Sequence, residues 1–231
     1  MKKEFKFKEG EVLLFNKPLH WTSFQLVNKV RWLIKRELGV KKIKVGHAGT
    51  LDPLANGLLI LCTGKMTKEI DQFQAAEKEY IATIKLGATT PSYDGEMEED
   101  HFYTTKHINE DLIIKTLQTF TGESLQYPPI FSALKVGGKK LYEIARKGNE
   151  VAVKPRTITI SRLEILELDM PYIKFRVTCS KGTYIRSLAH DIGKTLKSGA
   201  WLYKLERTRI GKQTIQGAIS LKEFEETIRL R

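Results

Sequence analysis

The sequence is poor in cysteine and has no long apolar run, and both absences narrow the classes of protein to which it can belong. Its two cysteines, Cys62 and Cys179, stand far apart and outside any C-x-x-C pair. A disulfide scaffold or a thiolate metal site is therefore not indicated, and both thiols are expected to be buried and reduced. No segment approaches the roughly 18 to 20 apolar residues that cross a bilayer, and lysines interrupt the start where a signal peptide needs its apolar stretch. We expect a cytoplasmic protein without a membrane partner.

Repeats, low-complexity tracts and flexible linkers are also missing. With 231 residues, 41% of them hydrophobic, the chain is long enough to bury a substantial core. This composition predicts one continuous folded body rather than a disordered chain.

Charge is unevenly distributed along the chain, which has a formal net charge of +12. Residues 1–44 carry +8 and residues 181–231 carry +6, so the middle carries −2. Two basic ends suit a polyanionic partner that touches a composite surface. Ordinary solubilising lysines would account for the charge equally well.

Hydrophobic periodicity predicts a mixture of strands and isolated helices. The expected strands are residues 11–18, 58–62, 79–87, 151–168 and 173–180, and the expected helices are residues 22–38, 108–120 and 183–196. The last helix places Arg186, His190, Lys194 and Lys197 on one stripe, and the acidic residues 89–100 read as an exposed loop. Because strict β-α-β alternation is absent, we predict an α/β fold of the α+β type, with a mixed, mostly antiparallel sheet and flanking helices.

The segment GHAGTLDPLANGLL, residues 46–59, allows two interpretations. In the structural one, Asp52 caps a helix that begins at Pro53, Asn56-Gly57 ends it, and His47 is an exposed loop residue. In the functional one, small residues around His47 let a substrate approach the backbone, and Asp52 sits on a constrained loop that leads into a buried strand.

Other residues limit what chemistry Asp52 could perform. No second carboxylate lies near it in sequence, and the five histidines show no metal-ligand spacing. A lone aspartate without a metal or cofactor must act as a nucleophile or a general base, and either role needs a nearby cation to keep it ionised and oriented.

Several segments together resemble one enzyme family, the TruB-type tRNA pseudouridine-55 synthases. GHAGTLDPLANGLL is similar to the family's catalytic motif, VLLFNKPLHWTS to its Lys-Pro motif and KEYIATIKLG to its tyrosine motif. CSKGTYIRSLAHDIG resembles the motif with an active-site tyrosine and arginine, and FSALKVGGKKLYEIARKG a further family segment. The resemblance runs in order from about residue 11 to about residue 211.

The resemblance implies a site when it is carried over residue by residue. The essential aspartate falls on Asp52, and the arginine that pairs with it falls on Arg186. The tyrosine that stacks on the flipped uracil falls on Tyr80, and a second active-site tyrosine on Tyr184. A histidine that enters the T-loop stack, a leucine that lines the uracil pocket and the lysine of the Lys-Pro motif fall on His47, Leu205 and Lys17. Taken alone, Tyr80 would fit a packed strand tyrosine, Arg186 a solvated basic stripe and Leu205 a core residue.

The family also implies an activity, a partner and a domain organisation. We expect isomerisation of the T-loop uridine-55 of tRNA, without a metal or cofactor, by a monomer that needs neither a protein partner nor a guide RNA. Residues 1–231 should form a single catalytic domain with an inserted, exposed loop around residues 89–105, which either points away from RNA phosphates or pairs with basic side chains. No separate C-terminal PUA domain is expected. The alternatives are a synthase for another RNA or one guided by RNA, and an RNA-binding or RNA-folding protein without catalysis.

Overall fold

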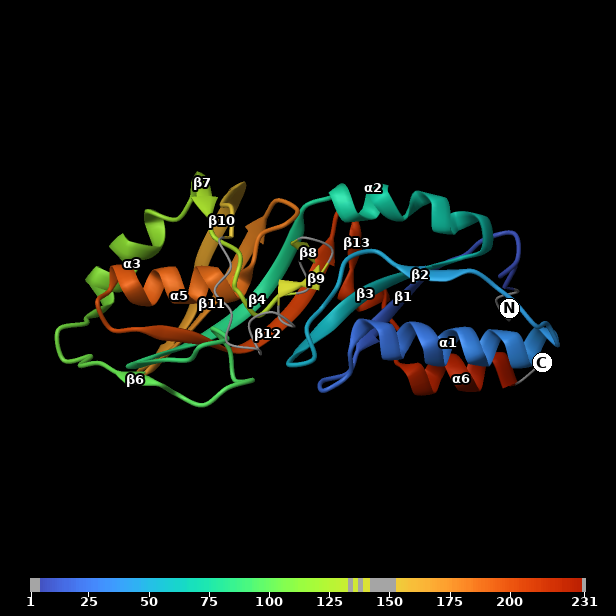
Figure 1. The fold of residues 1–231 in the computed structure, drawn as a ribbon, viewed down its shortest axis with the longest axis horizontal. Coiled ribbons are helices and arrows are strands. Elements are labelled where there is room, and N and C mark those ends of the chain that lie inside the picture. The colour runs from blue at the N-terminus through green and yellow to red at the C-terminus, as the bar shows by residue number, and fades with distance from the viewer. Residues whose placement is uncertain (1–4, 133–134, 137–138, 142–152, 230–231) are drawn as a thin grey trace. The chain divides into compact units, whose positions relative to one another are not determined.

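The computed structural model describes residues 5–132, 135–136, 139–141 and 153–229. The chain forms two compact units (Figure 1), one of residues 1–80 and 205–231 and the other of residues 81–204. Two long strands, β4 (Lys78–Leu86) and β12 (Ala200–Ile210), contain the boundaries between them. The expectation of one catalytic domain over residues 1–231 stays a prediction.

The first unit is built on the central strand β3. Its elements are β1 (Val12–Lys17), α1 (Ser23–Leu38), β2 (Val45–His47), β3 (Ala55–Thr63), η1 (Gly64–Glu69), α2 (Ile70–Ala75), β13 (Gln213–Thr214), η2 (Ile215–Gly217) and α6 (Leu221–Arg229). Strands β1 and β2 pair with β3 in antiparallel fashion, whereas β12 pairs with it in parallel, through Leu205 opposite Ala55. Residues on both sides of the Asp52 turn are thereby tied to three neighbouring strands.

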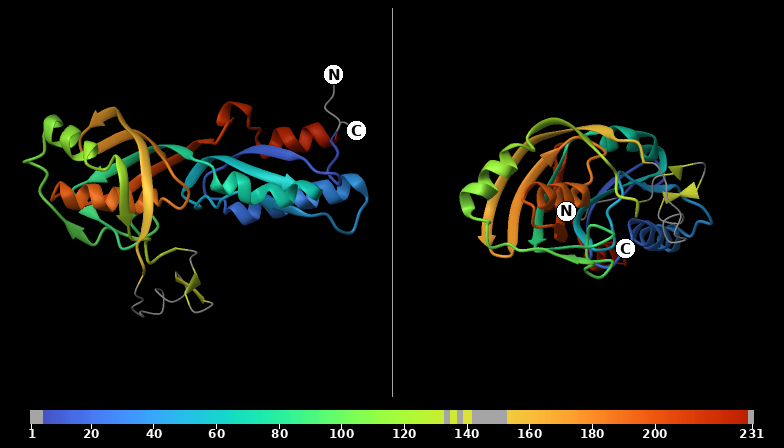
Figure 2. Two further views of the ribbon diagram at one scale, coloured as in Figure 1. Left: turned by 90° about the horizontal axis from the view of Figure 1, so that it is seen from above. Right: turned by 60° about the vertical axis from the view of Figure 1, so that its left-hand side comes forward.

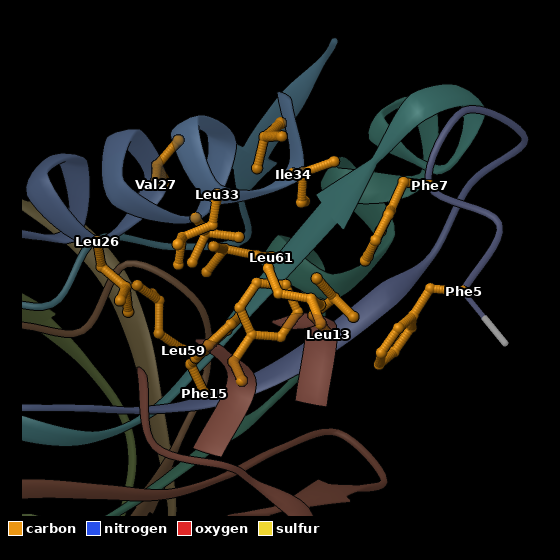
Figure 3. Close-up of a cluster of buried hydrophobic side chains, with 14 residues drawn as sticks. Phe5, Phe7, Leu13, Phe15, Leu26, Val27, Leu33, Ile34, Leu59 and Leu61 are labelled. Atoms are coloured by element: carbon orange, nitrogen blue, oxygen red, sulfur yellow. The ribbon is translucent and has the colours of Figure 1, made fainter. Parts of the chain in front are cut away.

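Helix α1 supplies much of the core of this unit. Thr22 and Gln25 form a capping box at its start, and Gly39, in the left-handed conformation, ends it. Its apolar residues pack on Phe15 of β1, Leu59 and Leu61 of β3 and two side chains of α6 (Figure 3). Each buried side chain of this size contributes roughly 1.5 to 3 kcal/mol, so α1 is firmly fixed on the sheet that carries the turn.

The second unit contains the other half of the sheet. Its elements are β5 (Ala88–Thr89), β6 (His101–Phe102), α3 (Glu110–Gln118), β7 (Gly122–Gln126), β8 (Lys135–Val136), β9 (Lys139–Lys140), β10 (Arg156–Asp169), β11 (Tyr172–Cys179) and α5 (Ile185–Thr195). The strand order is β12–β4–β11–β10–β7, and the pairs β10–β11 and β10–β7 are antiparallel. Helix α3 lies against α5 and β10 (Figure 2).

The predicted fold class is confirmed: the sheet is mixed and mostly antiparallel, with flanking helices. Both cysteines are buried, as predicted. The side chains of β11 alternate as predicted, except that Thr178, expected to face outward, is also buried. Most of the family-like segment at residues 131–148 lies outside the described residues. No helix of the described residues is long and apolar enough to cross a membrane.

Candidate active site

Asp52 lies on a tight turn between β2 and β3, not at the start of a helix. The backbone N–H of Ala55 donates to the Asp52 carbonyl at 3.1 Å, and β3 begins at Ala55. The interpretation of Asp52-Pro53 as a helix start is therefore wrong. Pairing with β1 and β12 supplies the backbone partners of the following residues, which outweighs the local capping signal.

The structural interpretation makes Gly57 part of a helix stop, but this glycine has a different role. It lies inside β3 with a φ of +107°, and a Cβ atom there would come within 2.4 Å of the Arg207 carbonyl oxygen. Glycine is required because two backbones approach closely at this point. The small residue thus places β3, and the turn before it, directly against β12.

Two further contacts hold the turn to the segment that leads into α1. The Ser23 hydroxyl donates to the Leu51 carbonyl at 3.0 Å and accepts from the Leu51 N–H at 2.9 Å. The backbone N–H of His20 donates to the Pro53 carbonyl at 2.7 Å. Asp52 is therefore bracketed on both sides by hydrogen bonds to residues 20–23.

Arg207 of β12 is a buried cation beside this turn that the sequence patterns did not single out. It is 1% exposed, and its guanidinium donates to the carbonyls of Leu58 at 2.7 Å, Gly49 at 3.1 Å and Thr50 at 3.3 Å. Among the described residues, none of its hydrogen bonds goes to a carboxylate. The signal that could have found it is its spacing of two from Leu205, which puts both on the inward face of a strand.

Lys17 is a second buried cation in this unit. It is fully buried, and its ammonium donates to the carbonyls of Pro18 at 2.9 Å and Trp21 at 2.6 Å. Burial lowers the pKa of Lys17 to about 8, the Asp52 carboxylate opposes this shift, and the Arg207 charge adds to it. The structural role of Lys17 near the site stays a prediction.

His47 ends β2, opposite Leu61 of β3. Burial lowers the pKa of His47, the Arg207 charge lowers it further, and a hydrogen bond with the Gly49 backbone opposes both effects. The imidazole is therefore held mainly in its neutral form at pH 7.

Tyr80 and Leu205 lie on the two strands that neighbour each other in the sheet. Tyr80 is 9% and Leu205 8% exposed. Burial alone agrees with the uracil-pocket roles and with the plain packing roles, so their contact with a base stays a prediction.

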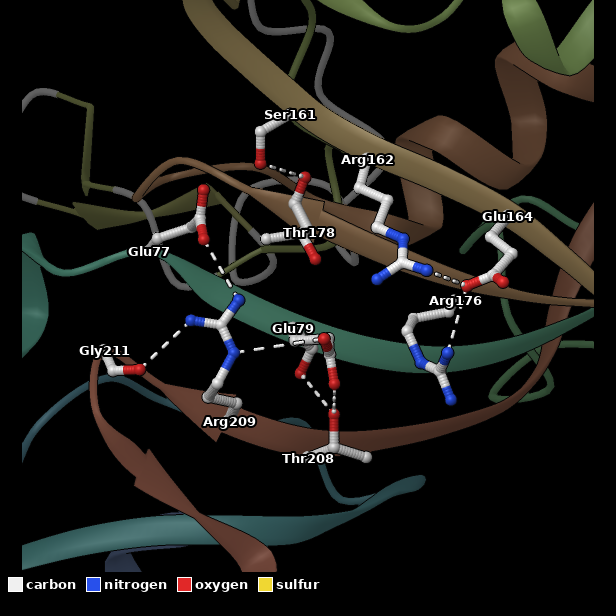
Figure 4. Close-up of polar contacts among 10 residues, drawn as sticks. All are labelled: Glu77, Glu79, Ser161, Arg162, Glu164, Arg176, Thr178, Thr208, Arg209 and Gly211. Atoms are coloured by element: carbon white, nitrogen blue, oxygen red, sulfur yellow. Dashed lines mark hydrogen bonds and ion pairs between the residues drawn. The ribbon is translucent and has the colours of Figure 1, made fainter.

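Neighbouring residues anchor these two strands. Glu79, which alternates with Tyr80 along β4, accepts a hydrogen bond from the Thr208 hydroxyl at 2.8 Å. Arg209 bonds the Glu77 carboxylate and the Gly211 carbonyl, both at 3.0 Å (Figure 4). In the second unit, Arg162 and Arg176 share the Glu164 carboxylate in the same manner. These surface pairs fix strand position more than they add stability.

In the second unit, Arg186 is buried near the start of α5. It is 6% exposed, and its guanidinium donates to the carbonyls of Phe131 at 2.9 Å and Ser92 at 3.3 Å. The Asp94 carboxylate lies 3.5 Å from the same nitrogen. The interpretation of Arg186 as part of a solvated stripe is therefore wrong, because the side chain points into the unit while Lys194 and Lys197 stay exposed.

Tyr184 immediately precedes α5 and is held by its backbone. Its N–H donates to the Gln126 side chain at 2.8 Å, and that side chain donates back to the Tyr184 carbonyl at 3.1 Å. The Arg156 guanidinium lies over the phenol ring, 5.5 Å from its centroid. The ring is half-buried, which suits a residue that could meet a ligand.

The acidic segment at residues 89–100 is only partly the exposed loop that was expected. Residues 95–98 are exposed, but Ser92 and Asp94 are buried beneath them. Glu99 pairs with Lys85 at 2.9 Å and accepts from the Trp201 indole at 2.7 Å. The expectation that the loop pairs with basic side chains is thus confirmed, and its full exposure is wrong because Asp94 turns inward to Arg186.

The candidate residues therefore form two groups. Lys17, His47, Asp52, Tyr80 and Leu205 belong to the first unit, and Tyr184 and Arg186 belong to the second. Within the described residues, no three His, Cys, Asp or Glu side chains gather as metal ligands do. The first unit offers the Asp52 carboxylate on a hydrogen-bonded turn, near the buried cations Lys17 and Arg207 and near apolar side chains.

Comparisons with known proteins agree with this chemistry. The family model described as TruB family pseudouridylate synthase, N-terminal domain, matches residues 35–185. A tRNA pseudouridine synthase B of Parabacteroides distasonis is 60% identical over 95% of this chain and 94% of that protein. The Flavobacterium johnsoniae protein of the same name is 53% identical over 96% of this chain and 97% of its own length.

Solved structures place the fold in the same group. A Cbf5–Nop10–Gar1 complex contains a chain that matches with a TM-score of 0.70 and 31% identity, over 95% of this chain and 54% of that one. The protein therefore spans about half of the length of that structural relative. From the family model, the full-length relatives and the shared fold, the chain belongs to the TruB family of pseudouridylate synthases.

Proposed function

We propose that this enzyme converts the T-loop uridine-55 of tRNA to pseudouridine, acting on the T stem-loop without a cofactor, a guide RNA or a protein partner. The observation that carries the proposal is the rigid, cation-flanked Asp52 turn, in a chain 60% identical to a tRNA pseudouridine synthase B. The uridine position, the independence of partners and the residue roles are what the proposal adds to family membership.

The reaction is an isomerisation and needs no external reactant. The bond between N1 of uracil and C1′ of ribose breaks, the uracil turns, and C5 bonds to C1′. The proton displaced from C5 is released, and N1 takes up a proton, so atoms and electrons balance. Asp52 can attack C1′, add to the uracil ring or remove a proton from the sugar, and each of these roles requires an ionised carboxylate.

Two buried cations, Lys17 and Arg207, lie close to the Asp52 turn. The Asp52 carboxylate raises the pKa of Lys17, and the Arg207 charge lowers the pKa values of both Lys17 and His47, which supports a site that includes these groups. A charge in a poorly solvated site interacts more strongly than one in water. The first unit by itself thus supplies positive charge near the Asp52 carboxylate.

The target base must leave its stack to react. Flipping a nucleotide costs a few kcal/mol. Stacking of the flipped base on an aromatic side chain contributes roughly 1 to 3 kcal/mol in return. Tyr80 and Leu205 are buried side chains with flat or apolar surfaces. Such walls would retain a detached uracil while leaving it free to turn.

The family resemblance assigns two residues of the second unit to the same reaction. Arg186 would bind the Asp52 carboxylate, and Tyr184 would contact the reacting nucleoside. The support for Arg186 is its burial and its fixed guanidinium, which already binds one carboxylate, that of Asp94.

The test is to incubate the purified protein in buffer and salt with an unmodified tRNA transcript and with its isolated T-arm hairpin, and then to map pseudouridine by chemical labelling and primer extension. We expect modification of one T-loop uridine in both RNAs. Asp52→Asn should reduce product more than a thousandfold while RNA affinity changes only a few-fold. Asp71→Asn, an exposed aspartate of α2, is the matched control.

Each other outcome contradicts part of the proposal. Modification of a different RNA alone would refute the tRNA target, and a requirement for a guide RNA would refute independent action. Turnover by Asp52→Asn at the wild-type rate would refute the catalytic assignment, and tight binding without any product would favour an RNA-binding protein.

A further inference from the structure

The solvent-facing side of α1 carries two exposed aromatic residues in a helix that also carries several cations. Phe24 is 64% and Trp32 49% exposed. The buried side is formed by residues such as Leu26, Val30 and Leu33, which recur at helical spacing. The cations fall on the remaining arc: Arg36 is exposed, Lys29 and Lys35 are half-buried, and the half-buried Arg31 donates to the Val45 carbonyl at 2.8 Å. Single exposed apolar residues are common on protein surfaces, so the informative feature is how these two aromatics lie among the cations.

The charge of this region has one sign. Residues 22–44 contain seven Lys or Arg and a single acid, Glu37. After α1 the excess continues in Lys41, Lys42 and Lys44, all exposed, on the connection to β2. An excess of positive charge of this kind attracts a polyanion, and an RNA backbone is the polyanion that a pseudouridine synthase must bind.

Trp32 fixes two of these cations. The Lys29 ammonium lies 4.8 Å and the Arg36 guanidinium 4.6 Å from the centre of its ring. Such contacts hold long side chains that would otherwise sample many rotamers, and less entropy is then lost when they bind a phosphate. A tryptophan already engaged by two cations positions charges and does not serve as a stacking platform for a base.

The surface begins at the catalytic turn. Ser23, the first residue of α1, makes the reciprocal hydrogen bonds with Leu51, next to Asp52. From there the 16-residue helix extends about 24 Å at about 1.5 Å per residue. An RNA with one nucleotide at Asp52 could therefore lay several phosphates along α1.

The far edge of the surface is set by α6. Arg36 lies 3.8 Å from the Glu225 carboxylate, and α6 also carries the exposed Glu223 and Glu226. Three neighbouring glutamates repel phosphates, so the surface ends where α1 meets α6. This edge makes Lys29 and Lys35 better test positions than Arg36.

We propose that the exposed side of α1, with Lys29 and Lys35 as its main contacts, binds the sugar–phosphate backbone of the stem that supports the target loop. This surface, which we call the α1 surface, comprises Phe24, Lys29, Arg31, Trp32, Lys35, Arg36, Lys41, Lys42 and Lys44. The proposal rests on the proposed function, because it names a second contact for the same RNA.

The experiment measures KM for the T-arm hairpin against salt concentration. In the double variant Lys29→Gln/Lys35→Gln, KM at about 0.15 M salt should rise roughly tenfold, and the slope of log KM against log salt should fall by about one for each lost phosphate contact. Turnover at saturating RNA should stay within twofold of the wild type. The matched control is Lys65→Gln/Lys68→Gln, two exposed lysines of η1 with the same loss of charge.

A shortened RNA separates stem binding from loop binding. With a hairpin whose stem is cut to a few base pairs, the α1 variant and the wild type should converge to the same KM. Equal salt slopes for the α1 variant and the control, or a tenfold difference that persists on the shortened RNA, would overturn the proposal. Thermal melting of each variant checks that folding is unchanged.

The α1 surface and the proposed function fail in different ways. If the wild type forms no pseudouridine, the function is refuted, and the same salt slopes measured by filter binding still decide whether α1 contacts the stem. Trp32→Ala gives a second readout. It should raise KM several-fold without lowering turnover, whereas an unchanged KM would count against the role of the tryptophan.

Discussion

Arg207 in the first unit and Arg186 in the second are both buried, yet they are used differently. Arg207 donates to carbonyls of Gly49, Thr50 and Leu58, which lie on either side of the Asp52 turn. Arg186 donates to two carbonyls and also faces the Asp94 carboxylate at 3.5 Å. The first guanidinium holds a backbone in shape, and the second is one half of a buried ion pair.

The difference shows how one residue type can serve two purposes. A guanidinium surrounded by carbonyls leaves its charge uncancelled, so it stabilises a nearby anion while it shapes the loop. A guanidinium that faces a carboxylate is oriented by it and is ready to meet another acceptor. We therefore expect loss of Arg207 to affect stability first, and loss of Arg186 to affect catalysis first.

The sharpest test of this contrast is Arg186→Lys. We expect kcat/KM of the folded variant for tRNA to fall at least about a hundredfold and the melting temperature to fall as well, because an ammonium cannot reach two carbonyls and a carboxylate in one planar arrangement. Steady-state kinetics and thermal melting measure the two effects. Arg176→Lys, which changes a half-buried arginine paired with Glu164 at 3.0 Å, is the control. Wild-type activity in Arg186→Lys would make that residue purely structural.

Arg207→Lys should reverse the order of the two effects. Leaving some of three buried carbonyls without a donor should lower the free energy of unfolding by about 3 kcal/mol, and kcat of the folded variant should fall about tenfold. Urea unfolding and single-turnover kinetics separate these quantities. The control is Arg209→Lys, next but one on β12, whose guanidinium bonds the half-exposed Glu77. A large loss of kcat at unchanged stability would remove the distinction between the two arginines.

The smallest effect concerns Lys17 and pH. Burial holds the pKa of Lys17 at about 8 in the folded protein, against 10.5 when exposed. Between these values the unfolded chain binds the extra proton, so stability should rise with pH from about 8 to 10.5. Activity should fall several-fold as the pH rises through about 8, because the folded protein loses the Lys17 charge there.

Lys17→Met should remove both pH effects. Urea unfolding and kcat measured at pH 7.5 and 9.5 test this. Lys78→Met controls for lost packing, because Lys78 is also buried and donates to backbone carbonyls, those of Gln74 and Ala76. Activity of the wild type that stays level up to pH 10 would show that the charge of Lys17 is not used.

The sequence patterns predicted the elements well where one face of a segment is buried. The helix at α1 and the strands β1, β4 and β11 follow their predicted ranges closely, because helical or twofold apolar spacing reports burial directly. The same patterns failed at Asp52-Pro53 and Asn56-Gly57. There, capping and turn signals of a few residues competed with the pairing of β3 to β1 and β12, and the pairing prevailed.

The candidate site was predicted in the same uneven way. The family-like motifs singled out Asp52 and Lys17, which the structure brings into one electrostatic environment. The contacts of Arg207, Asp94 and Ser23 were not predicted, since nothing in their immediate sequence distinguishes them from ordinary strand, loop and helix-start residues. Their hydrogen-bond partners are distant in sequence: Arg207 and Thr50 are 157 positions apart, and Ser23 and Leu51 are 28 positions apart.

By itself, the sequence determined the family and the fold class, because motifs and periodic burial are local properties that a single chain displays. Only the tertiary structure decided which cations lie near the Asp52 turn, that Arg186 points inward to Asp94, and that Lys29 and Arg36 of α1 lie over the Trp32 ring. The physical reason is that burial and pairing of polar groups depend on strands and loops that meet from distant parts of the chain.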